Sequence, residues 1–302
     1  MKTTIGIIGS QSMVGSQVCT LLSKTKTFEL VKADLIADIK VDITDKKSVE
    51  SFFKNYNFEW LILFSAYTDV NGAEKQRDDK TGSCYRINVL GSANIANACK
   101  IRSCKLIFIS TDYVFDGSKG PYSESAPSGP NIQKVGWYGI TKIKAEYYIQ
   151  KTLPQSDFII LRIAYPYSGI DTGKDDLVLR ITKLYKKGTL YPMYTDQIIT
   201  PTFIPDIAEA IKLLILNKQH GIFHVASPIT TTQYQFAKEL LKILKGKDVK
   251  IQTSQLKKLK SDPNISPRPV NGGLKVEKIQ QLGLSPINWK DGIKQIPKEI
   301  IN

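Results

Sequence analysis

Short apolar runs alternate with helix-like segments along the first 165 residues, and this alternation constrains the fold more than any other feature. The expected strands are residues 5–8, 28–33, 39–41, 60–64, 106–109 and 158–163. The expected helices are residues 14–22, 48–55, 87–98 and 138–151. Strands that are apolar along their whole length are typical of parallel sheets covered on both faces. The sequence therefore predicts an α/β fold with a doubly wound, Rossmann-like parallel sheet.

The pattern loosens after Tyr165, which indicates a smaller C-terminal lobe. The helices expected there are 176–186, 206–216 and 234–244, and one late strand is expected at 222–226. Residues 246–274 are rich in Lys, Ser and Pro and are expected to be irregular. We assign residues 1–165 to the sheet domain and expect residues 196–228 to pack onto it. The smaller lobe consists of residues 166–195 and 229–302.

The composition argues against several classes of protein. No run of 18 or more apolar residues occurs, and the N-terminus enters a strand directly, so neither a membrane span nor a signal peptide is expected. The four cysteines form no CxxC pair and there are only two histidines, which predicts no metal site and a cytoplasmic location. The net charge of +14 comes from dispersed lysines, so no nucleic-acid partner is expected.

A turn containing two glycines joins the first expected strand to the first expected helix. Its sequence is Gly9-Ser10-Gln11-Ser12-Met13-Val14-Gly15. Such a turn lets a pyrophosphate approach the backbone at a helix N-terminus. The glycines fill the outer positions of a GxxGxxG pattern, while Ser12 takes the middle one and fits without strain if its φ is negative. Two interpretations stay open: the turn binds a dinucleotide through Gly9, Gln11, Ser12, Met13 and Val14, or the glycines only tighten it.

Acidic residues follow the second and third expected strands. Asp34 lies 19 residues after Gly15, where a carboxylate can bind an adenosine ribose and repel a 2′-phosphate, which favours NAD. Lys32 and Lys40 lie near enough to bind that phosphate instead, so both NADH and NADPH stay open. Asp42 and Ile43 suit the edge and the face of an adenine. The alternative for Asp42 is an acid at the start of the following helix.

A tyrosine and a lysine four residues apart lie on one face of a helix and can form an acid–base pair. The nearby ammonium is expected to lower the pKa of the phenol. The spacing occurs three times, at Tyr138 and Lys142, Tyr147 and Lys151, and Tyr234 and Lys238.

The strand at 106–109 decides between the three pairs. It leads into Thr111, whose hydroxyl would lie at the carboxyl edge of the sheet, where ligands bind. Tyr138 opens a helix and can reach that edge, whereas Tyr147 lies two turns further on and Tyr234 lies in the second lobe. We therefore predict Thr111, Tyr138 and Lys142 as the catalytic residues.

Six further segments of the chain are distinctive: FSAYTDV at 64–70, INVLG at 87–91, STDYVFDG at 110–117, PYSE at 121–124, DQIITPT at 196–202 and RPVN at 268–271. Together with the features above, they resemble the dTDP-4-dehydrorhamnose reductase family of extended short-chain dehydrogenases/reductases, over nearly the whole chain. The resemblance implies reduction of the 4-keto group of a nucleotide-linked 6-deoxy sugar by NADH or NADPH, making dTDP-L-rhamnose. It leaves a homodimer open.

The resemblance also implies roles for individual residues. Tyr138 would protonate the keto oxygen, Lys142 would bind the nicotinamide ribose, and Thr111 would hydrogen-bond the same substrate oxygen. The further cofactor-binding residues it implies are Ser65, Ala66 and Tyr67. The further substrate-binding residues it implies are Asp112, Val114, Tyr165, Gln197 and Arg268.

Two other functions are weighed against the reductase. The regulatory subunit of methionine adenosyltransferase resembles the same fold and can keep a dinucleotide without catalysis. The intact Thr111, Tyr138 and Lys142 set and the Asp196-Gln197 pair argue against that option. A sugar-nucleotide epimerase or dehydratase is the third option, but dehydratases carry Asp-Glu after the active-site Thr, and here Asp112 is followed by Tyr113.

Overall fold

A seven-stranded parallel sheet forms the centre of the protein, in the computed structural model that describes residues 2–259 and 266–301. The strand order is β3-β2-β1-β4-β5-β6-β9, and every pairing is parallel. The strands are β1 (Thr3–Ile8), β2 (Phe28–Asp34), β3 (Ile39–Lys40), β4 (Trp60–Leu63), β5 (Lys105–Thr111), β6 (Phe158–Ile163) and β9 (Gly221–Val225). The predicted Rossmann-like α/β fold is confirmed.

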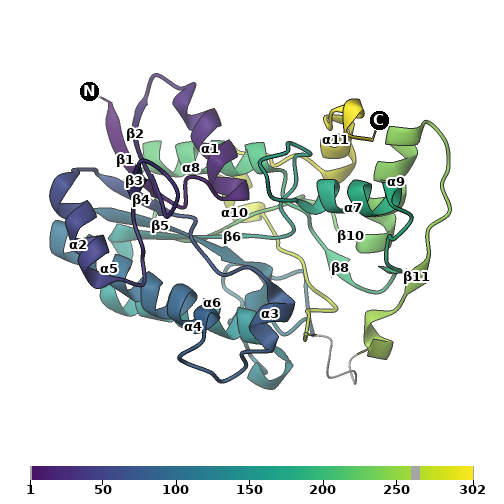
Figure 1. Ribbon diagram of the computed structural model, residues 1–302, viewed down its shortest axis with the longest axis horizontal. Helices are drawn as coiled ribbons and strands as arrows, with labels where there is room; N and C mark the ends of the chain where they lie inside the picture. The colour runs from purple at the N-terminus through teal and green to yellow at the C-terminus, as the bar shows by residue number, and fades with distance from the viewer. Residues whose placement is uncertain (1, 260–265, 302) are drawn as a thin grey trace.

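Helices cover both faces of this sheet (Figure 1). One face carries α1 (Met13–Ser23), α8 (Ile204–Leu216) and α10 (Glu277–Gln280), and the other carries α2 (Lys46–Asn55), α5 (Ser92–Arg102) and α6 (Trp137–Thr152). Separate apolar clusters fill the two interfaces, and β1, β4, β5 and β6 contribute to both because alternate side chains point to opposite faces. Burial on both sides explains why these strands are apolar throughout.

The strand order reverses between β1 and β4, which places a ligand crevice at their carboxyl ends. Strand β5 lies beside β4 and ends at Thr111, which pairs in register with Ile163 of β6. Short helical segments surround this edge: α3 (Val70–Glu74), α4 (Ser83–Tyr85), the π-helical η1 (Arg86–Gly91) and the 3-10 helices η2 (Asp112–Val114) and η3 (Ile132–Lys134). The 3-10 helix η4 (Gln155–Asp157) leads into β6.

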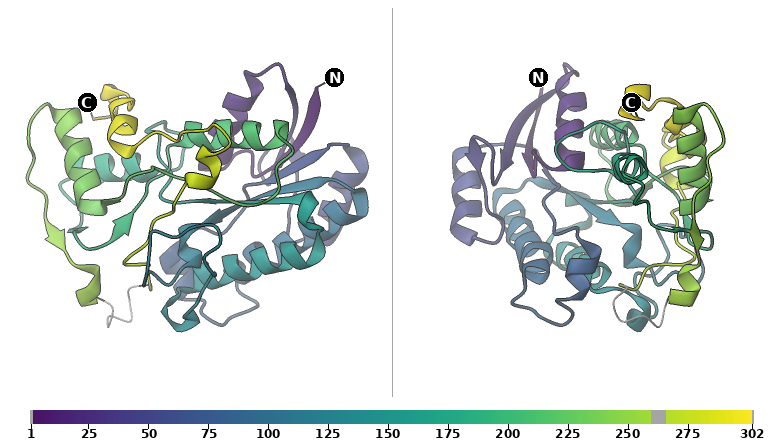
Figure 2. Two further views of the ribbon diagram at one scale, coloured as in Figure 1. Left: turned by 180° about the vertical axis from the view of Figure 1, so that it is seen from behind. Right: turned by 45° about the vertical axis from the view of Figure 1, so that its right-hand side comes forward.

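A smaller lobe lies beyond the carboxyl edge of the sheet (Figures 1 and 2). Its elements are α7 (Leu177–Lys186), β7 (Met193–Tyr194), β8 (Ile198–Ile199), β10 (Thr231–Thr232), α9 (Gln233–Lys245), β11 (Thr253–Ser254), η5 (Leu256–Leu259), α11 (Trp289–Lys294) and η6 (Lys298–Ile301). Helices α7, α9 and α11 share one apolar cluster with Tyr167 and Phe203.

The chain crosses between the sheet domain and this lobe several times. Residues 204–225 return to the sheet as α8 and β9, whereas β8, at the start of the segment 196–228, pairs with β10 in the smaller lobe. Leu274, Val276 and Ile279 also pack in the α1 and α8 face of the sheet, so part of the segment 229–302 lies with the sheet domain.

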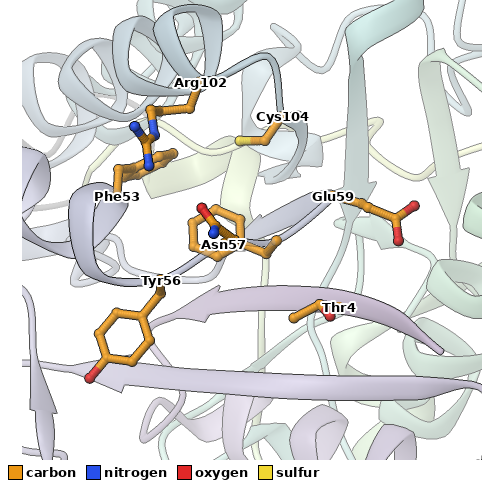
Figure 3. A pocket seen from close by; sticks show the side chains of 8 residues that line it. Thr4, Phe53, Tyr56, Asn57, Glu59, Arg102 and Cys104 are labelled. Carbon is orange, nitrogen blue, oxygen red and sulfur yellow. The ribbon is translucent and has the colours of Figure 1, made fainter. Parts of the chain in front are cut away.

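A cavity of about 350 Å3 lies at the amino ends of β1, β4 and β5, lined by side chains that include Thr4, Glu59 and Cys104 (Figure 3). It therefore lies at the edge of the sheet opposite to Thr111.

Within residues 2–259 and 266–301, no helix is long and apolar enough to cross a membrane.

Candidate active site

Thr111, Tyr138 and Lys142 meet at the carboxyl edge of the sheet. Thr111 ends β5 and caps η2, because its Oγ1 accepts a hydrogen bond from the Tyr113 N–H at 3.2 Å. Helix α6 begins one residue before Tyr138, and its first N–H donates to Glu74 Oε2 at 2.8 Å. A Cβ at Gly139 would lie 2.2 Å from the Tyr113 carbonyl oxygen, so only glycine lets α6 approach η2 this closely. The predicted trio is thus brought together by the ends of β5 and α6.

Lys142 is almost fully buried beneath this edge. Its Nζ donates to the Ile109 carbonyl oxygen at 2.8 Å and lies 3.8 Å from the centre of the Phe108 ring. Burial lowers the pKa of Lys142 to about 7, against opposing effects of Glu146 and Cys84. The ammonium is therefore only partly populated near neutral pH until a further negative or polar group stabilises it.

The expectation that Lys142 lowers the pKa of Tyr138 is wrong for this structure. The pKa of Tyr138 is raised, chiefly by burial, and a hydrogen bond from Thr111 offsets only part of that effect. The physical reason is that the burial that raises the pKa of the phenol also lowers the pKa of Lys142, so the lysine carries less positive charge near neutral pH. Tyr138 is consequently a protonated phenol at neutral pH, which is the form that donates a proton to a carbonyl oxygen.

Asp112 is a buried carboxyl group next to Thr111. The Thr111 hydroxyl lies 3.3 Å from Asp112 Oδ1, while Oδ2 is buried and has no hydrogen-bond partner within the described residues. Burial raises the pKa of Asp112 to about 7. A buried oxygen without a partner at the mouth of a site is an acceptor or donor available to a ligand.

The turn between β1 and α1 fits a dinucleotide pyrophosphate. Gly9 has φ +88°, and a Cβ there would lie 2.5 Å from the Ser65 backbone nitrogen. A Cβ at Gly15 would lie 2.2 Å from the Gly9 carbonyl oxygen. The N–H groups of Met13 and Val14 open the first turn of α1, where they have no intrahelical acceptor. The two glycines therefore let the turn pack closely against Ser65 and against its own backbone. The free N–H groups at the start of α1 are the part of this turn that could bind a phosphate.

Ser12 replaces the middle glycine without strain. It is the N-cap of α1, with φ −71° and ψ 161°, and its Oγ accepts the Gly15 N–H at 3.0 Å. This bond leaves the hydroxyl hydrogen free to donate to a phosphate. The negative φ meets the condition set by the sequence, so the serine does not argue against a dinucleotide in this turn.

The predicted adenosine-binding residues have different surroundings. Asp34 ends β2, and its Oδ2 accepts the Gln11 N–H at 3.0 Å, which fixes the carboxylate beside the turn. Asp42 uses Oδ1 to bind both the N–H and the hydroxyl of Thr44, each at 2.8 Å. Ile43 is buried in the α2 and α5 face of the sheet. Asp34 thus faces the cofactor turn, whereas Asp42 and Ile43 already have structural roles before helix α2.

Ser65, Ala66 and Tyr67 follow β4, and Ser65 lies directly against Gly9 of the turn between β1 and α1. Asn88 holds this segment in place: its Oδ1 accepts the Tyr67 N–H at 2.8 Å, and its Nδ2 donates to Thr141 Oγ1 at 3.0 Å. The loop after β4 is thereby tied to the catalytic helix α6. Within residues 2–259 and 266–301, no group of His, Cys, Asp and Glu side chains is arranged to hold a metal ion.

A cluster of polar side chains and tyrosines faces the smaller lobe. The Tyr165 hydroxyl lies 3.2 Å from that of Tyr113 and accepts a hydrogen bond from Gln197 Nε2 at 2.9 Å. Arg268 donates to Asn71 Oδ1 at 3.1 Å, and its Nε is buried without a partner within the described residues. Tyr165, Gln197 and Arg268 are therefore brought to one side of the catalytic residues, as a substrate-binding role requires.

Val114 is different from the other predicted substrate residues. Its side chain is fully buried in the cluster between the sheet and helices α1 and α8, and its carbonyl oxygen accepts the Gly129 N–H at 2.8 Å. Tyr138 belongs to a separate cluster with Tyr113, and Tyr165 packs against both clusters. Because Val114 points into the sheet core, we correct its assignment from substrate binding to packing.

The sequence interpretation missed three residues near the catalytic groups. The Tyr113 ring lies 5.8 Å from that of Tyr138, Cys84 Sγ lies 3.6 Å from Thr141 Oγ1, and Glu146 follows Lys142 by one turn. Only Glu146 had a sequence signal, since a carboxylate four residues after a lysine lies on the same helix face.

Known proteins are similar to this chain over most of its length. The family model described as RmlD substrate binding domain matches residues 2–301. A probable low-salt glycan biosynthesis reductase, Agl14, of Haloferax volcanii is 29% identical over 84% of this chain and 82% of its own. A dTDP-4-dehydrorhamnose reductase of Aggregatibacter actinomycetemcomitans is 28% identical over 96% of this chain and 97% of its own.

A solved structure shows the same likeness in three dimensions. The dTDP-4-dehydrorhamnose reductase of Clostridium acetobutylicum superimposes with a TM-score of 0.83 and 28% identity. The match covers 97% of this chain and 98% of that protein. The likeness therefore includes both the sheet domain and the smaller lobe.

Proposed function

The chain belongs to the family of the RmlD substrate binding domain, and from that premise we propose that it reduces the 4-keto group of a nucleotide-linked 6-deoxy sugar. The observation that carries the proposal is the meeting of Thr111, Tyr138 and Lys142 at the sheet edge that also bears the Gly9 turn. The protein is an NAD(P)-dependent oxidoreductase, with NADH or NADPH as its hydride donor.

The reduction needs a hydride at the carbonyl carbon and a proton at the carbonyl oxygen. The bound dinucleotide supplies the hydride. Tyr138, kept protonated by burial, donates the proton from its hydroxyl as the C=O π bond breaks. Thr111 hydrogen-bonds the same oxygen and orients the carbonyl group. Lys142 lies one turn along α6 and, when charged, stabilises the phenolate left on Tyr138.

The substrate extends from this centre toward the smaller lobe. Tyr165 and Gln197 are joined by a hydrogen bond there. Arg268 offers the nucleotide diphosphate a half-buried guanidinium whose Nε has no partner within the described residues. Gly9, Gln11, Ser12, Met13, Val14, Asp34 and Ser65 to Tyr67 bind the cofactor in this proposal. We take dTDP-4-dehydrorhamnose as substrate and dTDP-L-rhamnose as product. The similarity to both a rhamnose-pathway reductase and a glycan reductase makes other keto sugars the alternative outcomes of the test.

The cellular context belongs to the proposal as well. All four cysteines are free and buried, which suits a reducing cytoplasm.

The test compares the wild type with Tyr138→Phe. We expect the wild type to oxidise NADH or NADPH when dTDP-4-dehydrorhamnose is added, and the variant to lose about 10²-fold or more of kcat while still binding the dinucleotide. Phenylalanine keeps the ring in its cluster, so circular dichroism should be unchanged. A wild type that binds the dinucleotide but reduces no keto sugar would instead support a non-catalytic regulatory subunit.

A further inference from the structure

A buried ion pair lies directly behind the catalytic residues and is not used in the reaction described above. Arg162 of β6 and Glu146 of α6 are 1% and 2% exposed. Arg162 Nη2 lies 2.6 Å from Glu146 Oε2, and Nε lies 2.9 Å from Oε1, so the two side chains form a bidentate pair. Arg162 also lies over the Phe115 ring, 5.1 Å from its centre.

Polar side chains from β5, from the loop between η2 and η3 and from β9 contact the pair. The Ser110 hydroxyl donates to Glu146 Oε1 at 2.5 Å. Arg162 Nη2 donates to Ser128 Oγ at 2.8 Å, in the loop between η2 and η3, and Nη1 lies 3.4 Å from His224 Nε2 of β9. His224 Nδ1 in turn lies 3.1 Å from the Lys275 carbonyl oxygen.

These contacts are one residue or one turn away from the catalytic groups. Ser110 immediately precedes Thr111 in β5, and Glu146 follows Lys142 by one turn of α6. We propose that the Arg162–Glu146 pair is the positioning device of the active site: it locks α6, which carries Tyr138 and Lys142, against β5, which carries Thr111. The inference rests on the proposed reductase function.

The stability of the fold does not by itself account for a buried ion pair at this place. Replacing both charges with apolar groups of similar volume is often neutral or stabilising, because the desolvation cost disappears. Stability alone therefore does not require the pair. What apolar groups cannot supply is the directed bond from Glu146 to Ser110, or a negative charge one turn from Lys142.

The charges around the pair decide its effect on pH dependence. Glu146 and Cys84 favour the charged form of Lys142 against burial. On the far side, His224 stays neutral, since burial together with Arg162 and Lys278 lowers its pKa to about 3. Glu124, which accepts the His224 N–H at 3.2 Å, faces Lys278 and not Lys142. Glu146 is therefore the carboxylate of this group that acts on Lys142.

The experiment uses two variants of the whole chain, Glu146→Gln and the double variant Glu146→Leu with Arg162→Met. Asp175→Asn is the matched control, because it removes one carboxylate of an exposed ion pair with Lys183 that has no contact with Glu146 or Arg162 among the described residues. Each protein is measured for unfolding by denaturant, for kcat and KM against pH, and for NADH binding by calorimetry against pH.

We expect the double variant to fold and to lose at least about tenfold in kcat, with KM changed by less than about threefold, as for a group that acts in the transition state. In Glu146→Gln, the midpoint above which NADH binding weakens should move to lower pH, by about one unit, because Lys142 loses the charge that favours its ammonium. Asp175→Asn should match the wild type in all measurements.

Wild-type kcat and an unshifted binding midpoint in folded variants would overturn the inference. The binding measurement also separates the two proposals. If the wild type reduces no keto sugar while Glu146→Gln still shifts the midpoint, the reductase proposal fails and the positioning role of Glu146 stands.

Discussion

Replacing Asp112 with asparagine should make the free energy of unfolding of the protein less sensitive to rising pH. The carboxyl group is buried, and its pKa rises from an ordinary value of 3.8 to about 7. A folded-state pKa above the unfolded one means that the folded protein holds the proton more tightly. The cost to stability is thus absent below pH 3.8, grows as the pH rises, and is complete above pH 7.

The size of the effect follows from these two pKa values. Between about pH 5 and pH 8, ionisation of Asp112 should lower the free energy of unfolding of the wild type by about 2.5 kcal/mol. The asparagine of the Asp112→Asn variant has no such ionisation. Its side-chain oxygen keeps the acceptor for Thr111, and its amide nitrogen takes the place of the unpartnered Oδ2 at both pH values, so any cost of that group cancels in the comparison.

Urea unfolding of both proteins at about pH 5 and pH 8 measures the difference. We expect Asp112→Asn to gain about 2 to 3 kcal/mol relative to the wild type on going from the lower to the higher pH. Asp38→Asn, which removes an exposed carboxylate from the turn after β2, is the control and should show no such gain. An equal pH dependence of wild type and Asp112→Asn would refute the reasoning, since it would mean that this carboxyl group is already ionised in the folded state at the lower pH.

Substitutions at three further positions test the turn and the close approach of α6 to η2. Ser12→Ala should cost about 1 kcal/mol in the free energy of unfolding through the lost N-cap, and Ser12→Gly only a few tenths, as measured by urea denaturation. Asp34→Ala should lower the ratio of the NADPH dissociation constant to the NADH dissociation constant in calorimetry, because it removes the carboxylate that repels a 2′-phosphate. An unchanged ratio would mean that the adenosine binds elsewhere. Gly139→Ala should lower kcat and the unfolding midpoint together, since its Cβ would lie 2.2 Å from the Tyr113 carbonyl oxygen, whereas wild-type values would show that α6 can shift freely.

The proposed catalytic residues Thr111, Tyr138 and Lys142 illustrate how much the sequence alone can predict. The spacing of Tyr138 and Lys142 predicts that both lie on one face of α6, and the apolar strand before Thr111 predicts the edge at which they meet. The pKa of the phenol could not be predicted in the same way. It depends on how completely neighbouring segments exclude water, and here burial raises the pKa of Tyr138 and lowers that of Lys142.

The sequence also could not predict the surroundings of the proposed substrate-binding residues. Val114 follows Thr111 by three residues, and the 3-10 turn η2 sends its side chain into the sheet core, away from the crevice. Arg268 and Asn71 are hydrogen-bonded although 197 positions separate them in the sequence. Such contacts are set by the packing of the smaller lobe against the sheet edge.

Periodicity and spacing along the chain were enough to predict the parallel sheet, its order of helices and strands, the glycine turn and the catalytic trio, because these patterns act over a few residues. The protonation of Tyr138, Lys142 and Asp112, and the Arg162–Glu146 pair behind them, emerged only when distant segments packed together. Burial and long-range hydrogen bonds are properties of the assembled fold, and they fix the chemistry that a local pattern only makes available.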